Sequence, residues 1–280
     1  MDNFSVDAYT PEQIAKRIEK VGISKSVNDP ISVLALAILA GAFIAFGAVF
    51  FTLVTYDSGV MAGGLVRLIG GLVFCLGLIL VVVAGAELFT GNNLIVMAYV
   101  DGQVTFSGLM RNWFLVYIGN FIGALGVLLL IYLSNHWFIG DGAVGEKAIL
   151  IANAKVNLTW MEAFSRGILC NILVCLAVWL CFAGRSVVDK IVAIIFPITA
   201  FVAMGFEHSV ANMYFIPAGI VAMQDSGLIA LVGDIDLTNL TTSGFLLDNL
   251  LPVTLGNIIG GSVFVALFYW FIYLRGKSRE

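Results

Sequence analysis

Charged residues are sparse along the chain, and the intervals between them are long and apolar. Four intervals without a charged residue are long enough to cross a bilayer: 30–56, 112–135, 167–184 and 249–274. A transmembrane helix needs about 20 mainly apolar residues. These intervals therefore predict spans one, three, four and six of a membrane protein.

Two further apolar stretches are each interrupted by a glutamate. They are 68–100, which contains Glu87, and 191–224, which contains Glu207 and His208. The first glutamate is soon followed by Thr-Gly-Asn-Asn, a poor helix-forming sequence, and the second directly by His-Ser. We expect spans two and five to be helices that break at these points.

Two short motifs occur once in each half of the chain, in the same order. G-x-E-x(4)-N starts at Gly85 and Gly205, in the interrupted spans, and G-N-x-I-G starts at Gly119 and Gly256, early in spans three and six. This indicates a duplication, and three spans per half require the two halves to be inverted in the membrane. The four G-N-x-I-G glycines are expected to pack helices. The predicted fold is all-α, with six transmembrane helices, an inverted 3+3 repeat and interrupted helices two and five around a central site.

The amino-terminal segment is polar and predicts one amphipathic helix. Thr10, Pro11 and Gln13 have the spacing of an N-cap, a first-turn proline and a capping box. The apolar stripe and the polar side are Ile14, Ile18 and Val21, and Lys16, Arg17 and Lys20. Gly22 is predicted to end the helix. The helix either lies in the membrane interface or docks on a pore mouth and influences gating, and the sequence leaves both open.

The repeat divides the chain into five expected parts. They are an amino-terminal cytoplasmic helix at 1–28, a first repeat at 29–135, a periplasmic connection at 136–159, a second repeat at 160–275 and a cytoplasmic tail at 276–280. Six spans place both termini on one side, which carries ten lysines and arginines, Lys277 and Arg279 among them, against four on the other side. The positive-inside rule makes that side cytoplasmic.

Composition excludes other classes of protein. Only 11% of residues are charged, the mean hydropathy is +1.02 and the net charge is −4, which excludes a water-soluble globule and a nucleic-acid binder. The four cysteines are Cys75, Cys170, Cys175 and Cys181, all inside apolar runs. We interpret them as buried small hydrophobes, not as disulfides or metal ligands. No metal site and no cofactor is expected.

The interrupted spans hold the candidate chemistry. Ionisable groups inside a membrane are functional by default, although Glu87 and Glu207 could equally bond backbone N–H groups freed by the breaks. His208 can exchange a proton near neutral pH and is assigned a function. The Thr90 hydroxyl, beside freed N–H groups, suits a small anion. Gly91, Asn92 and Asn212 at the breaks, and Asn120 and Asn257 in the second motif, are interpreted as structural.

Four segments together resemble the formate–nitrite transporter family: 86–92, 170–179, 205–213 and 251–257. The resemblance implies an aquaporin-like protomer in a homopentamer of a bacterial inner (plasma) membrane, with one pore per protomer. It implies transport of formate and related small monovalent anions, linked to protons, across the lipid bilayer.

The resemblance also implies roles for individual residues. His208 and Thr90 would form the central pair, with Asn171 and Glu207 supporting the histidine, and Lys155 would draw anions in. A constriction on the periplasmic side would be formed by Phe74, Leu78 and Phe201, and a cytoplasmic slit around the Thr90 loop by Leu88 with its neighbours. Phe89 is a further bulky apolar residue that flanks this loop.

Three alternatives remain at this point. A nitrite or hydrosulfide channel would share most of these motifs. An aquaporin-type pore for neutral solutes is disfavoured because neither break contains Asn-Pro-Ala. An intramembrane enzyme is disfavoured because the chain has only two histidines, His136 and His208, and no spacing typical of a catalytic triad.

Overall fold

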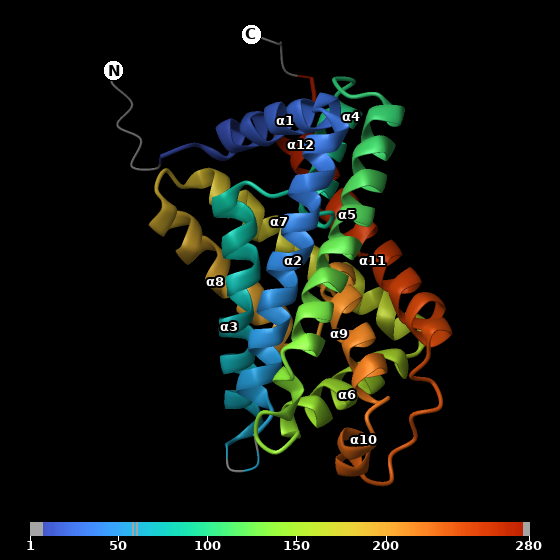
Figure 1. Cartoon of the computed structure of the whole chain (residues 1–280). Helices are drawn as coiled ribbons and strands as arrows, with labels where there is room; N and C mark the ends of the chain where they lie inside the picture. Colours follow the sequence, from blue (N-terminus) through green and yellow to red (C-terminus); the bar gives the residue numbers. More distant parts are fainter. Residues whose placement is uncertain (1–7, 58, 60, 277–280) are drawn as a thin grey trace.

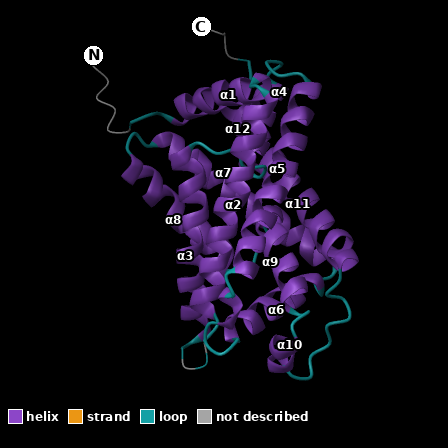
Figure 2. Ribbon diagram, in the orientation of Figure 1, coloured by secondary structure: helices purple, strands orange, loops and turns teal. Residues whose placement is uncertain are grey.

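The computed structural model describes residues 8–276, apart from residues 58 and 60, and this part of the chain is helical without any strand (Figures 1 and 2). The longer helices are α1 (Pro11–Val27), α2 (Pro30–Thr55), α3 (Gly63–Ala84), α5 (Phe106–Leu133), α6 (Ala143–Val156), α7 (Trp160–Ala183), α8 (Val187–Ala203) and α9 (Ser209–Ala222). Shorter pieces are η1 (Gly91–Ile95), α4 (Val96–Val100), η2 (His136–Phe138) and α10 (Ser226–Val232). The last span combines η3 (Gly244–Leu250), α11 (Leu251–Gly261), η4 (Ser262–Leu267) and α12 (Phe268–Tyr273).

Five helices are long and apolar enough to cross a membrane: α2, α3, α5, α7 and the run Gly244–Tyr273. A sixth is obtained if α9 and α10, which meet at 105°, are counted as one bent span. In the predicted arrangement span five is instead α8 followed by α9, and α8 has only 17 residues because it stops at the expected break. By length and composition, the described part of the chain thus has the five or six candidate spans of an all-helical membrane protein.

Both predicted helix breaks are present. Gly85, directly after α3, has φ 75°, and Gly205, two residues after α8, has φ 72°. This left-handed conformation is easy only for glycine and ends each helix. The chain then runs without regular structure through 86–88 and 206–208 before helix resumes at η1 and α9.

The G-N-x-I-G glycines allow close helix contact in both halves. A Cβ atom on Gly123 of α5 would overlap the backbone oxygen of Ile38 in α2, and one on Gly260 of α11 would overlap that of Ile168 in α7. The two helix pairs α2·α5 and α7·α11 thus pack backbone to backbone, as small residues four apart predict.

Helix α1 begins as predicted but does not end at Gly22. Its capping box between Thr10 and Gln13 is present, and the helix continues to Val27. Gly22 instead lets α1 lie against Ile95 and Ala98, since its Cβ would be 3.4 Å from atoms of both. The predicted end was wrong because this glycine serves helix contact and not termination.

Helices α1 and α6 lie at opposite ends of the bundle. The end with α1 and α12 is called the terminal face here, and the end with α6 and α10 is called the α6 face (Figure 1). Residues 1–7 and the tail beyond Gly276, including Lys277 and Arg279, lie outside the described residues.

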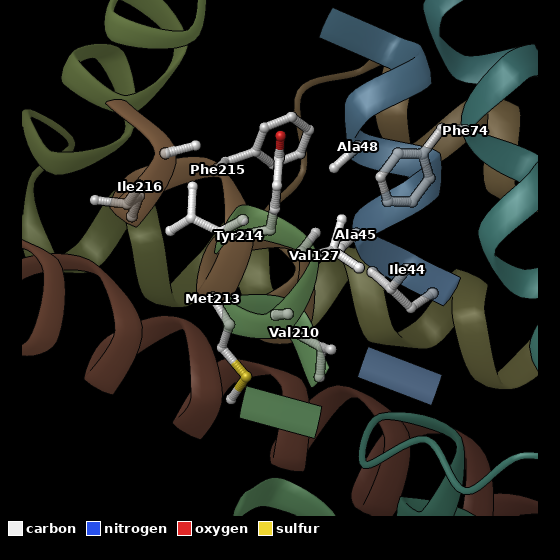
Figure 3. Packing of buried hydrophobic residues seen from close by; sticks show 14 of the residues in the cluster. Ile44, Ala45, Ala48, Phe74, Val127, Val210, Met213, Tyr214, Phe215 and Ile216 are labelled. Carbon is white, nitrogen blue, oxygen red and sulfur yellow. The ribbon is translucent and has the colours of Figure 1, made fainter. Parts of the chain in front are cut away.

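Apolar side chains from both halves form the core between these faces. Figure 3 shows Ile44 and Ala48 of α2 and Phe74 of α3 close to Phe215 of α9. All four cysteines are buried and free, which confirms their interpretation as small apolar residues.

Candidate functional site

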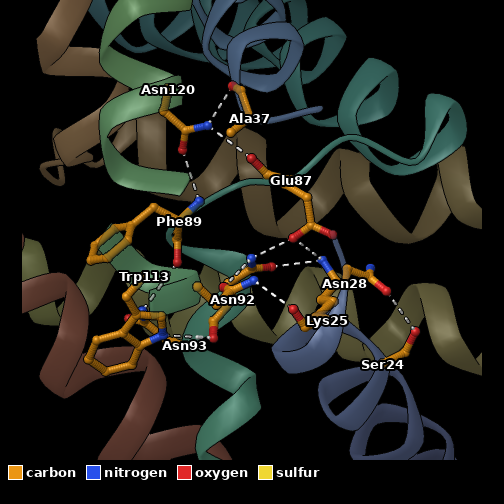
Figure 4. A network of polar contacts seen from close by, with 11 residues as sticks. Ser24, Lys25, Asn28, Ala37, Glu87, Phe89, Asn92, Asn93, Trp113 and Asn120 are labelled. Carbon is orange, nitrogen blue, oxygen red and sulfur yellow. Dashed lines mark hydrogen bonds and ion pairs between the residues drawn. The ribbon is translucent and has the colours of Figure 1, made fainter. Parts of the chain in front are cut away.

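Asn120 of α5 holds the first helix break in place. Its Oδ1 accepts the backbone N–H of Phe89 at 2.9 Å, and its Nδ2 donates to the backbone oxygens of Ala37 and Glu87 at 2.8 and 2.9 Å (Figure 4). Backbone groups that lose their helical partners in a membrane must find others. The fully buried amide supplies them for the break and ties it to α2.

Asn257 of α11 does the same for the second break. Its Oδ1 accepts the N–H of Ser209 at 2.9 Å, and its Nδ2 donates to the backbone oxygens of Gly167 and Glu207 at 2.8 and 3.0 Å. The two asparagines therefore have equivalent bonding patterns, which is direct structural support for the duplication seen in the sequence.

The Glu87 side chain points to the terminal face and is bound by a lysine from α1. Lys25 Nζ lies 2.9 Å from Glu87 Oε2 and 2.8 Å from Asn92 Oδ1. Asn92 Nδ2 donates to the same carboxylate at 2.6 Å and to Asn112 Oδ1 at 2.9 Å (Figure 4). Asn112 in turn donates to the backbone oxygen of Lys25 at 3.1 Å. The buried carboxylate is thus both paired and hydrogen-bonded, as a charge in such a place requires.

Glu207 has an equivalent network toward the α6 face. Lys155 Nζ of α6 lies 2.8 Å from Glu207 Oε1. Asn212 Nδ2 donates to Glu207 Oε2 and to Asn249 Oδ1, both at 2.7 Å. Asn249 donates to the backbone oxygen of Lys155 at 2.9 Å. Of these four residues, only Asn249 is not predicted from the sequence, because it belongs to neither repeated motif.

His208 and Thr90 meet where the two breaks approach each other. Thr90 Oγ1 and His208 Nε2 are 3.0 Å apart, and both residues are buried. The N–H of Ala211 donates to His208 Nδ1 at 3.0 Å, so the ring is the N-cap of α9. Because a backbone N–H can only donate, Nδ1 is an acceptor, and the neutral ring carries its hydrogen on Nε2. That hydrogen points to Thr90 Oγ1, whose own proton is left to donate elsewhere.

Asn171 joins the site from the threonine side. Its Nδ2 lies 3.2 Å from the backbone oxygen of Thr90, 2.9 Å from Asn93 Oδ1 and 2.7 Å from the backbone oxygen of Asn257. These contacts fix the loop that carries Thr90, so Asn171 acts on the central pair through the threonine.

Aromatic rings lie beside the histidine. The Phe74 and Phe201 rings meet edge to face at 5.9 Å, and the Phe201 ring stacks on His208 at 5.9 Å. Phe215, which the sequence analysis missed, stacks on Phe74 at 6.4 Å. Phe89 packs elsewhere, with its ring 4.9 Å from that of Tyr117 in α5.

A cavity of about 550 Å³ opens between α1 and the first break. Leu78, Leu88, Gly91 and Asn92 are among its lining residues. Its charged lining residues are Glu87 and the cations Arg17, Lys25, Arg185 and Lys190. A cavity with this excess of positive charge attracts anions. Leu78 lines this cavity together with Leu88, although it was expected beside Phe74 and Phe201 on the periplasmic side, so the walls of the cavity are partly charged and partly apolar.

Comparison with known proteins identifies the family. A family model described as formate/nitrite transporter matches residues 12–271. The chain belongs to the formate/nitrite transporter family. Membership confirms the resemblance inferred from the motifs and makes the protein a transporter and not an enzyme.

Named members of the family cover nearly the whole chain. The formate channel FocA of Escherichia coli is 45% identical over 278 residues, 98% of each chain, and FocA of Haemophilus influenzae is 41% identical over 270 residues, 93% of each. A solved pentameric formate channel with formate bound superposes with a TM-score of 0.82 at 41% identity, over 88% of this chain and 98% of that one. A solved ion channel of the family superposes with a TM-score of 0.78 at 28% identity, over 92% and 98%. These likenesses confirm the predicted fold class.

Proposed function

We propose that the protein is a homopentameric channel for formate and related small monovalent anions, with one pore in each protomer. The observation that carries the proposal is the buried Thr90–His208 pair, in which His208 stacks on Phe201 and Thr90 adjoins Gly91 in the lining of the cationic cavity. The similarity to formate channels over 98% of the chain supports formate as the substrate, and the solved pentameric channel supports the assembly.

Lysines at both faces gather the anion. Lys25 lies in the terminal-face cavity and Lys155 lies beside Glu207 toward the α6 face. Positive charge at the mouth of a low-dielectric passage raises the local concentration of anions. Each lysine is also paired with a glutamate. Because the carboxylate offsets part of the positive charge, the lysine attracts an anion without binding it tightly.

The central pair offers hydrogen bonds where the anion leaves water. Transfer of a bare carboxylate past the Phe74 and Phe201 rings is costly unless hydrogen bonds replace its hydration. The Thr90 hydroxyl can supply a bond, because the His208 Nε2–H already satisfies its oxygen as acceptor. The neutral ring also keeps its bond from Ala211, whereas the imidazolium would turn a second N–H toward that donor. We therefore favour a mechanism in which formate crosses as an anion that is hydrogen-bonded to the Thr90 hydroxyl. Proton-linked transport is the second candidate.

Flux measurements in liposomes test this function. We expect rapid formate flux and slow glycerol flux through the reconstituted pentamer. Faster nitrite or hydrosulfide flux than formate flux would assign the channel to another substrate of the same class. Glycerol flux equal to formate flux would contradict an anion channel.

We further propose that the terminal face is cytoplasmic and that the membrane is the bacterial inner membrane. The excess of lysine and arginine on that face supports this orientation. A green fluorescent protein fused after Glu280 should fluoresce in intact bacteria, because it folds in the cytoplasm. A dark fusion in a channel that is inserted and pentameric would contradict this orientation.

A further inference from the structure

The ring of Phe215 faces the ammonium group of Lys155. Lys155 Nζ lies over the ring at 5.4 Å from its centroid, close enough for a cation–π interaction. The same ring stacks on Phe74 at 6.4 Å and meets Phe51 edge to face at 5.7 Å. Phe215 is only 7% exposed. It therefore links Lys155 to Phe74, whose own ring contacts the Phe201 ring that stacks on His208. Figure 3 shows Phe215 and Phe74 within the core.

The first half of the chain has no ring at the equivalent place. Phe215 follows Glu207 by eight residues, and Ile95 follows Glu87 by eight. Both halves are otherwise similar here, since each glutamate binds one lysine and the asparagine five residues after it, although Glu207 also accepts a longer bond of 3.2 Å from Asn249. The aromatic ring is thus a specific feature of the α6 face.

The two lysines differ in their second partner. Lys25 Nζ donates to Glu87 and to Asn92 Oδ1, at 2.9 and 2.8 Å. Lys155 Nζ donates to Glu207, but the equivalent oxygen, Asn212 Oδ1, is buried and has no hydrogen-bond partner within the described part of the chain. Lys155 Nζ instead lies over the ring of Phe215, 5.4 Å from its centroid.

We propose that Phe215 is a positioning residue that keeps the Lys155 ammonium available to anions arriving from the α6 face. An ammonium has three N–H donors, and a ring face attracts the charge without accepting a defined N–H bond. Lys155 therefore keeps more free donors for an anion than Lys25 does, and it holds them beside the aromatic constriction. The proposal rests on the proposed anion transport and adds a difference in affinity between the two faces.

The repeat supplies the substitution that tests this. Phe215→Ile installs the side chain of the equivalent position and frees Lys155 to turn to Asn212 Oδ1. Formate is added to one side of a planar bilayer that holds oriented pentamers, and the half-saturating concentration is measured for each face. For formate supplied at the α6 face, we expect this concentration to rise roughly two- to five-fold, the range of an exposed to partly buried cation–π contact. The maximal flux, and the half-saturating concentration at the terminal face, should stay as in the wild type.

Three matched variants separate positioning from helix packing. Phe215→Tyr keeps the ring and should keep the wild-type value. Phe121→Ile makes the same change at a partly buried ring, into the residue of its own repeat partner Ile258, and should leave both faces unchanged. In a Lys155→Met background, Phe215→Ile should have no further effect on the half-saturating concentration.

Clear outcomes would overturn the proposal. An equal effect of Phe215→Ile with and without Lys155, or a loss of maximal flux at an unchanged half-saturating concentration, would reduce Phe215 to a core residue. The same conclusion would follow if Phe215→Tyr formed a folded pentamer but raised the half-saturating formate concentration at the α6 face as much as Phe215→Ile does. A wild-type pentamer without any formate flux would instead remove the proposed function, and this inference with it.

Discussion

Lys25 and Lys155 occupy equivalent places in the two halves of the protein, each bound to the glutamate of its own helix break at 2.9 and 2.8 Å. Each also lies five residues before the helix that opens the next span, α2 at Pro30 or α7 at Trp160. The repeated unit is therefore larger than three spans. It begins with a helix, α1 or α6, that lies across the end of the bundle and places a lysine at the break.

This equivalence predicts a stability role for both lysines. Lys25→Met and Lys155→Met each leave a glutamate side chain that is 5% exposed without its cation. Removal of one partner of a buried pair costs about 3–5 kcal/mol, and the partial exposure of Lys25 places it at or below the lower end. Thermal unfolding of the purified pentamer measures the loss.

An exposed pair on the same helix provides the control. Lys16 and Glu12 are 3.6 Å apart with side chains 54% and 37% exposed, so Lys16→Met should change stability by less than about 0.5 kcal/mol. Restoration of stability by Glu87→Gln in the Lys25→Met background would confirm the buried charge as the cause. Equal, small effects of Lys16→Met and Lys25→Met would show that α1 is only loosely attached.

Close contact between α5 and α2 predicts a sharp difference between two glycines. Gly123→Ala must push α5 away from the Ile38 backbone, whereas a Cβ on Gly126, one turn further along, meets nothing within 4 Å. Overpacking typically costs about 1–3 kcal/mol, and more where backbone must move. Gly126→Ala should be neutral or stabilising by up to about 1 kcal/mol. Chemical denaturation of the two variants in detergent makes the comparison, and similar midpoints would contradict the close contact.

The sequence predicts the breaks and the duplication well, because both are local. Gly85 and Gly205 end helices through their own backbone conformation, and the motifs around Glu87 and Glu207 can be aligned by eye. The burial of the cysteines follows in the same way from the apolar runs around them.

What the sequence does not reveal depends on contacts between distant segments. Lys25 and Glu87 are 62 residues apart in the sequence. Because Gly22 was predicted to end the first helix, Lys25 was not expected to lie on it. Asn112 and Asn249 lie inside apolar helices and are informative only once Asn92 and Asn212 are seen beside them. Phe89 was expected with a constriction because it adjoins Thr90, yet its ring packs on α5, a direction that only the structure gives.

Two roles of His208 can be separated by substitution. The ring caps α9 through Ala211 N–H and bonds Thr90 through Nε2. Asparagine is among the best N-cap residues, so His208→Asn should keep the cap and remove the titrating group. We expect His208→Asn to remove the dependence of formate flux on pH between 5 and 8. Histidine is the only type of side chain whose unperturbed pKa lies in this range, and His208 is the only histidine in the described spans.

His208→Phe serves as the companion variant. It removes both roles, and loss of the cap alone should cost about 1 kcal/mol. Flux of both variants is measured per folded pentamer across the same pH range. Unchanged pH dependence in His208→Asn would exclude the histidine as the source of pH sensitivity, whatever happens to stability.

Thr90 tests the hydrogen bond offered to the anion. Thr90→Val keeps the shape of the side chain and removes the hydroxyl that lies 3.0 Å from His208 Nε2, while Thr90→Ser keeps the hydroxyl. A hydrogen bond to a charged group contributes about 1.5–3 kcal/mol, or roughly one to two decades in rate if it forms as the anion crosses. We expect formate flux to fall by that factor in Thr90→Val and to remain substantial in Thr90→Ser.

Thr90 also accepts the hydrogen bond of His208, and the same variants test this second role. His208 Nε2 loses its acceptor in Thr90→Val, and an unsatisfied buried donor costs about 1–3 kcal/mol of stability. Formate flux, glycerol flux and thermal stability are therefore compared for the wild type, Thr90→Val and Thr90→Ser. Selective loss of formate flux per folded pentamer, with glycerol flux unchanged, supports a direct bond to the anion. A Thr90→Val channel that is less stable but carries formate at the wild-type rate would show that Thr90 holds the histidine and does not touch the substrate.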